Sequence, residues 1–75
     1  MITLTDNQET KVGAGTYAIK TTGACDLLWD IGDGLFFQAI EGASFSEATT
    51  AQINLPACSV KLTGASTLSL LLMNS

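Results

Sequence analysis

Short runs of alternating hydrophobic and polar residues, separated by turn residues, make up most of the chain. Clear examples lie at 2–5, 16–20, 25–31, 52–55 and 59–63. A period of two places alternate side chains on one buried face, which is the pattern of a half-buried β-strand. No stretch keeps a helical period long enough to form a helix. The chain is therefore predicted to be all-β.

The last apolar run of the chain is different, because its end is apolar on both faces. One parity carries Leu68, Leu70 and Leu72, and the other carries Leu71 and Met73. A strand of this kind must be covered from both sides. A chain of 75 residues has few elements with which to cover it.

A run in the middle of the chain is ambiguous in the same way. Two sets of residues compete for the interior there: Leu35, Phe37 and Ala39 against Phe36 and Ile40. Glu41-Gly42 then breaks the run, and a very short strand carrying Phe45 is predicted at 43–46. The polar residues 6–10 are predicted to form a loop.

Two glycine-containing turns predict hairpins. Gly32-Asp33-Gly34 supplies the positive φ angles that a type I′ turn requires, so it should join the strands on either side of it. Gly64-Ala65-Ser66 should do the same for the last two strands of the chain, with Gly64 available for a positive φ.

These elements predict a single domain over residues 1–75. Seven or eight short strands at intervals of roughly 8–12 residues are typical of a small antiparallel β-sandwich or a jelly-roll-like barrel. The expected core, taken from the inward parity of each strand, is Ile2, Leu4, Tyr17, Ile19, Leu27, Trp29, Ile31, Phe37, Phe45, Ile53, Leu55, Val60, Leu62, Leu68, Leu70 and Leu72.

Composition adds that the domain needs help to be stable. It is 47% hydrophobic and 13% charged, at a length where one core only just offsets the entropy of folding. Small domains obtain help from disulfides, a metal or oligomerisation. The chain has two cysteines, no histidine and no acidic cluster with metal-ligand spacing, so we expect oligomerisation and neither a metal nor another cofactor.

Net charge and the length of the apolar runs argue against two classes of partner, nucleic acid and membranes. The net charge is −4 and the three lysines form no cluster, so no basic surface is available for nucleic acid. The longest apolar run is far shorter than the ~20 residues of a membrane-spanning helix, so no membrane partner is expected. The first residues have neither the basic nor the apolar segment of an export signal, which predicts synthesis in the cytoplasm.

Catalytic chemistry finds little support in the residues. Without histidine the usual Ser/His/Asp and Cys/His nucleophile systems cannot be assembled, so the chain is predicted not to be an enzyme. The Asp30 to Gly34 segment lacks the further ligands of a calcium loop and is interpreted as a turn. Cys25 and Cys58 could lie close enough for a bridge, but in a reducing cytoplasm both are expected to be free thiols.

Three segments together resemble a group of small virion proteins of tailed bacteriophages. They are GAGTYAIK at 13–20, the strand and hairpin with Asp33-Gly34, and LPACSVKLTGASTLSLLL at 55–72. Cys58 stands where the family pattern usually has glycine, and Lys61 where it often has arginine. The resemblance implies a small β-sandwich or jelly-roll-like structural protein, such as a capsid decoration (cement) protein on the virion surface.

Three hypotheses about function remain. The first is a decoration protein that binds the major capsid protein and stabilises the shell. The second is a neck, tail or fibre-associated virion subunit. The third is a small ligand- or carbohydrate-binding β-module, against which both Trp29 and Tyr17 count, because they have core parity whereas sugar sites present exposed aromatic rings.

The apolar residues off the core parity are the expected contact surface for a homotrimer or another small cyclic oligomer on the capsid. They are Leu28, Phe36, Leu71 and Met73; Phe36 could instead fill the other side of a small barrel. Interface centres are depleted in charge. The charged residues expected on rims or in solvent are Asp6, Glu9, Lys11, Glu41 and Glu47.

Overall fold

The chain folds back on itself so that its two halves pair strand by strand. The computed structural model describes residues 1–30 and 37–74, which form β1 (Ile2–Leu4), β2 (Glu9–Val12), β3 (Gly15–Thr21), β4 (Cys25–Asp30), β5 (Gln38–Phe45), β6 (Thr50–Leu55), β7 (Cys58–Thr63) and β8 (Leu68–Asn74). β1 pairs with β8, β2 with β7, β3 with β6 and β4 with β5, and every pair is antiparallel.

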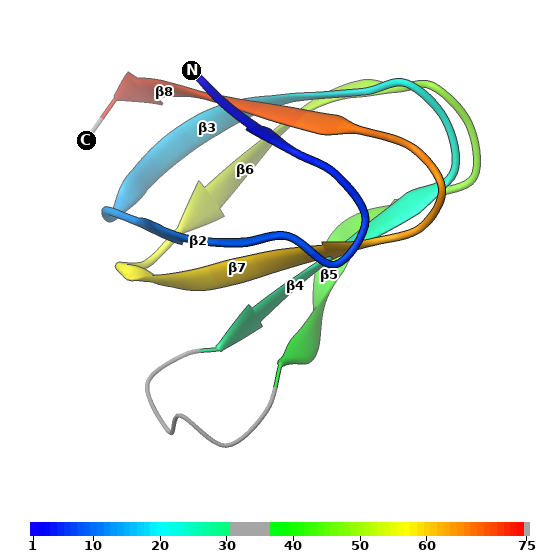
Figure 1. Ribbon diagram of the computed structural model, residues 1–75. Coiled ribbons are helices and arrows are strands. Elements are labelled where there is room, and N and C mark those ends of the chain that lie inside the picture. Colours follow the sequence, from blue (N-terminus) through cyan, green and yellow to red (C-terminus); the bar gives the residue numbers. More distant parts are fainter. Residues whose placement is uncertain (31–36, 75) are drawn as a thin grey trace.

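Two further pairings roll this long double ribbon into two sheets. β8 also pairs with β3, and β7 with β4, which gives sheet A the order β1-β8-β3-β6 and sheet B the order β2-β7-β4-β5 (Figure 1). Eight strands in two sheets with this order form a jelly roll. The prediction of a small all-β sandwich or jelly-roll-like barrel is confirmed.

The core is the single layer between the inner faces of the two sheets. Its buried hydrophobic residues are Leu4, Val12, Tyr17, Ile19, Cys25, Leu27, Ile40, Ala43, Leu55, Val60, Leu62, Leu68 and Leu70. Ile2, Trp29, Phe45 and Ile53 pack against this layer while remaining partly exposed. The buried Tyr17 hydroxyl keeps a partner, because it donates to the Gly13 carbonyl oxygen at 2.7 Å.

Two residues of the expected core are placed elsewhere. Leu72 has inward parity but is 50% exposed, because it lies past the point where β1 stops flanking β8. Phe37 is only half-buried, and its ring centroid lies 5.7 Å from the Lys61 Nζ. Ile31 lies outside the described residues. Four core residues were missing from the expected set: Val12, Cys25, Ile40 and Ala43.

The strands expected at 35–40 and 43–46 overlap a single strand, β5. Between the Asp26–Ser44 pair and the Leu28–Ala39 pair, the chain advances by two residues in β4 but by five residues in β5. The extra residues of β5 form a bulge. Gly42 sits inside this bulge with φ 84°. The extra residues turn Ile40 and Ala43 inward and leave Ala39 exposed, so of the two competing parities the structure places that of Ile40 inside.

The loop expected at 6–10 is wrong at Glu9 and Thr10, which are the first two residues of β2. The strand Glu9–Val12 pairs with β7, and in this register Glu9 lies opposite Lys61 and Val12 opposite Cys58. Only Val12 is fully buried and two of the four residues are charged. An edge strand of this composition has almost no hydrophobic alternation, so its pairing depends on the strand beside it.

The hairpin expected at Gly64-Ala65-Ser66 is also wrong. β7 belongs to sheet B and β8 to sheet A, so this segment carries the chain from one sheet to the other. Gly64 does have the expected positive φ, at 129°. The hairpin expected around Asp33-Gly34 has its two strands paired as β4 and β5, although the turn itself lies outside the described residues.

The crossing at Gly64 leads to a stability prediction. A Cβ atom added there would lie 2.8 Å from the Cys25 Cα and 2.9 Å from the Ala24 carbonyl oxygen, at a φ that other residues rarely adopt. Gly64→Ala should therefore lower the free energy of unfolding by about 2 kcal/mol or more in urea titrations. Gly13→Ala is the matched control, since nothing lies within 4 Å of its added Cβ. Equal effects of the two substitutions would contradict this account of the crossing.

Candidate binding surface

Four large hydrophobic side chains are exposed at one end of sheet A. They are Met1 (86% exposed), Leu71 (52%), Leu72 (50%) and Met73 (53%), and we call them the apolar tip. Three of them end β8, and Figure 1 shows the N-terminus beside the same end of that strand. These are the exposed large hydrophobic side chains of the described residues; Leu71, Leu72 and Met73 are consecutive in β8, and Leu72 has the opposite parity to Leu71.

The ends of the strands explain why the apolar tip is uncovered. The last β1–β8 pair is Ile2 with Leu70, so beyond Leu70 the strand keeps β3 as its neighbour on one side only. Leu71 points away from the core, because it alternates with the buried Leu68 and Leu70. Met73 is exposed where the β3–β8 register shifts, between the Tyr17–Leu72 and Thr16–Asn74 pairs. The end of β8 that the sequence shows to be apolar on both faces is therefore uncovered in the single chain.

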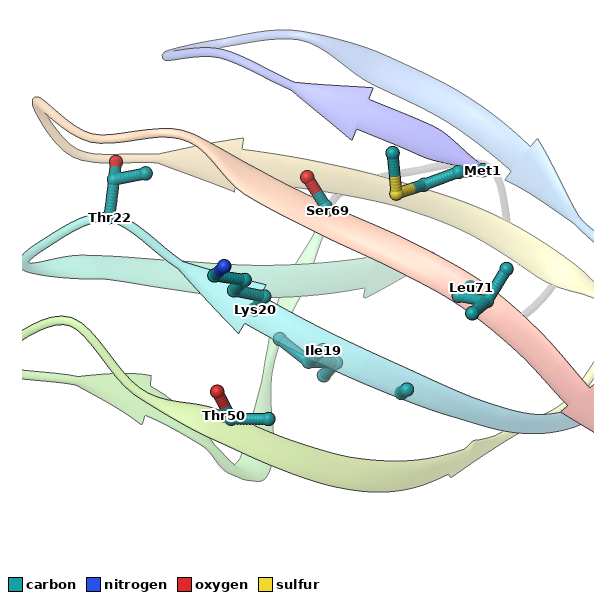
Figure 2. Close-up of a pocket in the computed structure, with 8 residues that line it drawn as sticks. Met1, Ile19, Lys20, Thr22, Thr50, Ser69 and Leu71 are labelled. Atoms are coloured by element: carbon teal, nitrogen blue, oxygen red, sulfur yellow. The ribbon is translucent and has the colours of Figure 1, made fainter.

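A groove continues from the apolar tip across the outer face of sheet A. It has a volume of about 480 Å³, and its lining includes Met1, Ala18, Lys20, Thr50, Ser69 and Leu71 (Figure 2). Figure 2 shows Ser69 and Leu71 on β8, Lys20 on β3 and Thr50 at the start of β6, with Met1 beside them just before β1. Small and hydroxyl side chains make its floor shallow, while Met1 and Leu71 form an apolar end shared with the tip.

Charge is distributed unequally over the two outer faces. The alternation along the strands gives the described outer face of sheet A one charged residue, Lys20. The outer face of sheet B carries Glu9, Lys11, Asp26, Asp30 and Lys61. The apolar tip therefore lies on the nearly neutral side of an acidic protein.

The structure brings together two of the four residues expected at an interface. Leu71 and Met73 are both in the apolar tip. Leu28 is half-buried on the outer face of sheet B, opposite Ala39 and Lys61, and so belongs to another surface. Phe36 lies outside the described residues.

Two residues of the tip were not expected. Leu72 was assigned to the core by its parity, and the sequence contains no signal that the β1–β8 pairing begins at Ile2 and Leu70, two positions short of it. Met1 precedes the first alternating run, so no pattern included it. The charged positions expected in solvent are all exposed: Asp6, Glu9, Lys11, Glu41 and Glu47.

Other kinds of site find no support in the described part of the chain. Within it, no group of three or more Cys, Asp or Glu side chains is placed to hold a metal ion. None of its elements is a helix long and apolar enough to cross a bilayer. Every buried side-chain nitrogen or oxygen atom described has a hydrogen-bond partner.

The two thiols are free and lie toward opposite ends of sheet B. Cys25 begins β4 and Cys58 begins β7, and these strands are antiparallel, with Asp26 opposite Thr63 and Asp30 opposite Ser59. Burial raises the pKa of the Cys25 thiol above its ordinary value, and the Asp26 carboxylate adds to this. Burial likewise raises the pKa of the Cys58 thiol, with a smaller contribution from Asp30.

Comparisons with known proteins do not assign the chain to a family. It matches no protein-family model, no curated protein and no solved structure.

The thiols give a prediction about reactivity. A raised pKa keeps a thiol protonated to higher pH, and only the thiolate attacks a disulfide reagent. Both native thiols should react slowly at pH 8 and faster as the pH rises past the usual thiol range of about 8.5. Cys25, which is 4% exposed, should react more slowly than the half-buried Cys58. Spectrophotometric titration of the wild type and of Cys25→Ser separates the two rates, and a Cys25–Cys58 linkage in native protein would contradict the placement.

Proposed function

We propose that this chain is a non-enzymatic structural protein of a tailed bacteriophage that decorates the capsid and strengthens it by binding coat subunits. The observation that carries the proposal is the apolar tip. The jelly-roll topology supports it, since viral capsid proteins often use this architecture, although lectins and cupins use it as well. The three sequence segments that resemble small phage virion proteins favour the viral alternative.

The apolar tip is large enough to dock the protein but too small to hold it alone. Burying a large apolar side chain contributes about 1.5–3 kcal/mol, so covering these four partly exposed chains contributes roughly 4–7 kcal/mol. Association itself costs about 4–15 kcal/mol in lost freedom of motion. One tip would therefore bind weakly.

Several tips held in one assembly would bind far more tightly, because the later contacts form at high effective concentration. For this reason we propose that the decorating unit is a homotrimer. Copies arranged around a three-fold axis would present their tips together to neighbouring coat subunits. The outer face of sheet B, which carries charges of both signs, would then point away from the contact and stay in solvent.

A protein bound only to the assembled shell stabilises that shell by mass action. Particles lacking the chain should open at lower temperature than decorated ones. Adding purified protein back should restore the difference in a thermal release assay of packaged nucleic acid.

The apolar tip gives the test of the proposal. Leu71→Asp with Met73→Asp places two charges in the surface to be buried, so binding to bare particles should fall by at least a hundredfold in a co-sedimentation assay. Both side chains are exposed, so the variant should remain folded by circular dichroism.

The matched control adds the same charge at the other end of the molecule. Ala48→Asp with Ala65→Asp changes two exposed residues that precede β6 and β8, and binding should be unchanged. Equal binding by both double variants, or absence of the chain from purified virions, would refute the proposal.

A further inference from the structure

The four edge strands of the two sheets are protected against pairing to different degrees. Natural edge strands avoid unwanted pairing by being short, by carrying charges or proline, or by bulging. β1 has only three residues, β2 carries Glu9 and Lys11, and β5 carries Glu41 and the bulge at Gly42. Each of these three edges has at least one protective feature.

β6, the other edge of sheet A, has none of them. Its six residues, TAQINL, contain no charge and no proline, since Pro56 comes just after the strand ends. It runs in unbroken register with β3 from the Lys20–Thr50 pair to the Gly15–Leu55 pair. In a chain with seven acidic residues and a net charge of −4, a neutral edge of this length stands out.

The register shows which backbone groups of β6 face outward. The Thr21 amide donates to the Thr49 carbonyl oxygen at 2.8 Å, which places this pair at a hydrogen-bonded position of the β3–β6 ladder, with the Thr49 amide donating to the Thr21 hydroxyl oxygen. Such pairs alternate along an antiparallel ladder, which assigns Ala51 and Ile53 to bonding with β3. The N–H and C=O groups of Thr50, Gln52 and Asn54 therefore point to the open side of the sheet.

We propose that β6 pairs antiparallel with β6 of a second copy of the chain, around a two-fold axis at Gln52. In that register Gln52 lies opposite Gln52 of the second copy, and Thr50 lies opposite Asn54. All the outward N–H and C=O groups then meet partners, giving roughly six backbone hydrogen bonds. The two copies of sheet A become one continuous sheet.

A second copy is the occupant because the edge is self-complementary. A two-fold axis perpendicular to the sheet keeps inner faces together, so Ala51 of one copy lies beside Ile53 of the other. Ile53 packs on the core but is only half-buried, and the second copy would cover it. On the outer face only Thr, Gln and Asn side chains meet, so no like charges oppose each other.

This contact goes beyond the proposed function and does not depend on it. The β6 contact has a two-fold axis, whereas the proposed capsid contact uses the end of β8 in copies around a three-fold axis. The β6 contact also requires no capsid. Either could fail while the other holds.

The test introduces a charge at the two-fold axis. Gln52→Lys places two ammonium groups opposite each other across the pairing, while its exposed side chain leaves the fold intact. Sedimentation equilibrium should show that the substitution halves the mass of the assembly and weakens the association at least tenfold. Gln38→Lys is the matched control, with the same change at an exposed position of the β5 edge.

Hydrogen exchange identifies the contact directly. In the wild type the outward amides of Gln52 and Asn54 should exchange at least tenfold more slowly than in Gln52→Lys, whereas the Ile53 amide, bonded to β3, should be little changed. A wild type that stays monomeric, an assembly unaffected by Gln52→Lys, or one lost only in the Leu71→Asp, Met73→Asp variant would overturn the proposal.

Discussion

One dry layer between two four-stranded sheets is the constraint on which the rest of this structure depends. A jelly roll of eight short strands has two inner faces, and these enclose the whole core. An apolar residue of outward parity has no other layer to enter. Such a residue stays at least partly exposed in the single chain, as Leu28 and Leu71 do, so parity along each strand sets both the core and the apolar surface of the fold.

The segments that connect the two sheets run past the edges of this core layer, and hydrogen bonds hold them in place. Thr21, at the end of β3, is a buried polar residue, and its hydroxyl lies 3.3 Å from the Glu47 carbonyl oxygen and accepts from the Thr49 amide at 2.9 Å. The Gly64 amide donates to an Asp6 carboxylate oxygen at 2.9 Å. Both sets of contacts join segments far apart in sequence, as folding the two halves of the chain together requires.

The sequence predicts the strands better than their partners. Alternation identified β1, β3, β4, β6, β7 and β8, because each has an inward parity that repeats. It could not reveal β2, whose single buried residue is Val12, or the bulge that exchanges the faces of β5. Nor could it show that the chain crosses between sheets at Gly64, since a crossing and a hairpin both need a turn with positive φ.

The candidate site was partly predictable for the same reason. The exposure of Leu71 follows from parity alone, which is local; Met73 is exposed as parity predicts, but it lies at a register shift that the pattern does not reveal. The exposure of Leu72 does not follow from parity, because it depends on where β1 stops on the neighbouring side of β8. The edge β6 could be judged only once the order of strands was known, since its lack of charge has no meaning in a central strand.

Sheet A and sheet B therefore differ in what they offer to other molecules. The apolar tip, the groove and the unprotected β6 edge all belong to sheet A, whose described outer face carries the single charge of Lys20. Charged residues of both signs occupy the outer face of sheet B. Desolvating those charges would cost free energy, whereas desolvating Leu71 or pairing the backbone of Gln52 would not. The asymmetry favours sheet A over sheet B as the surface for the contacts proposed above.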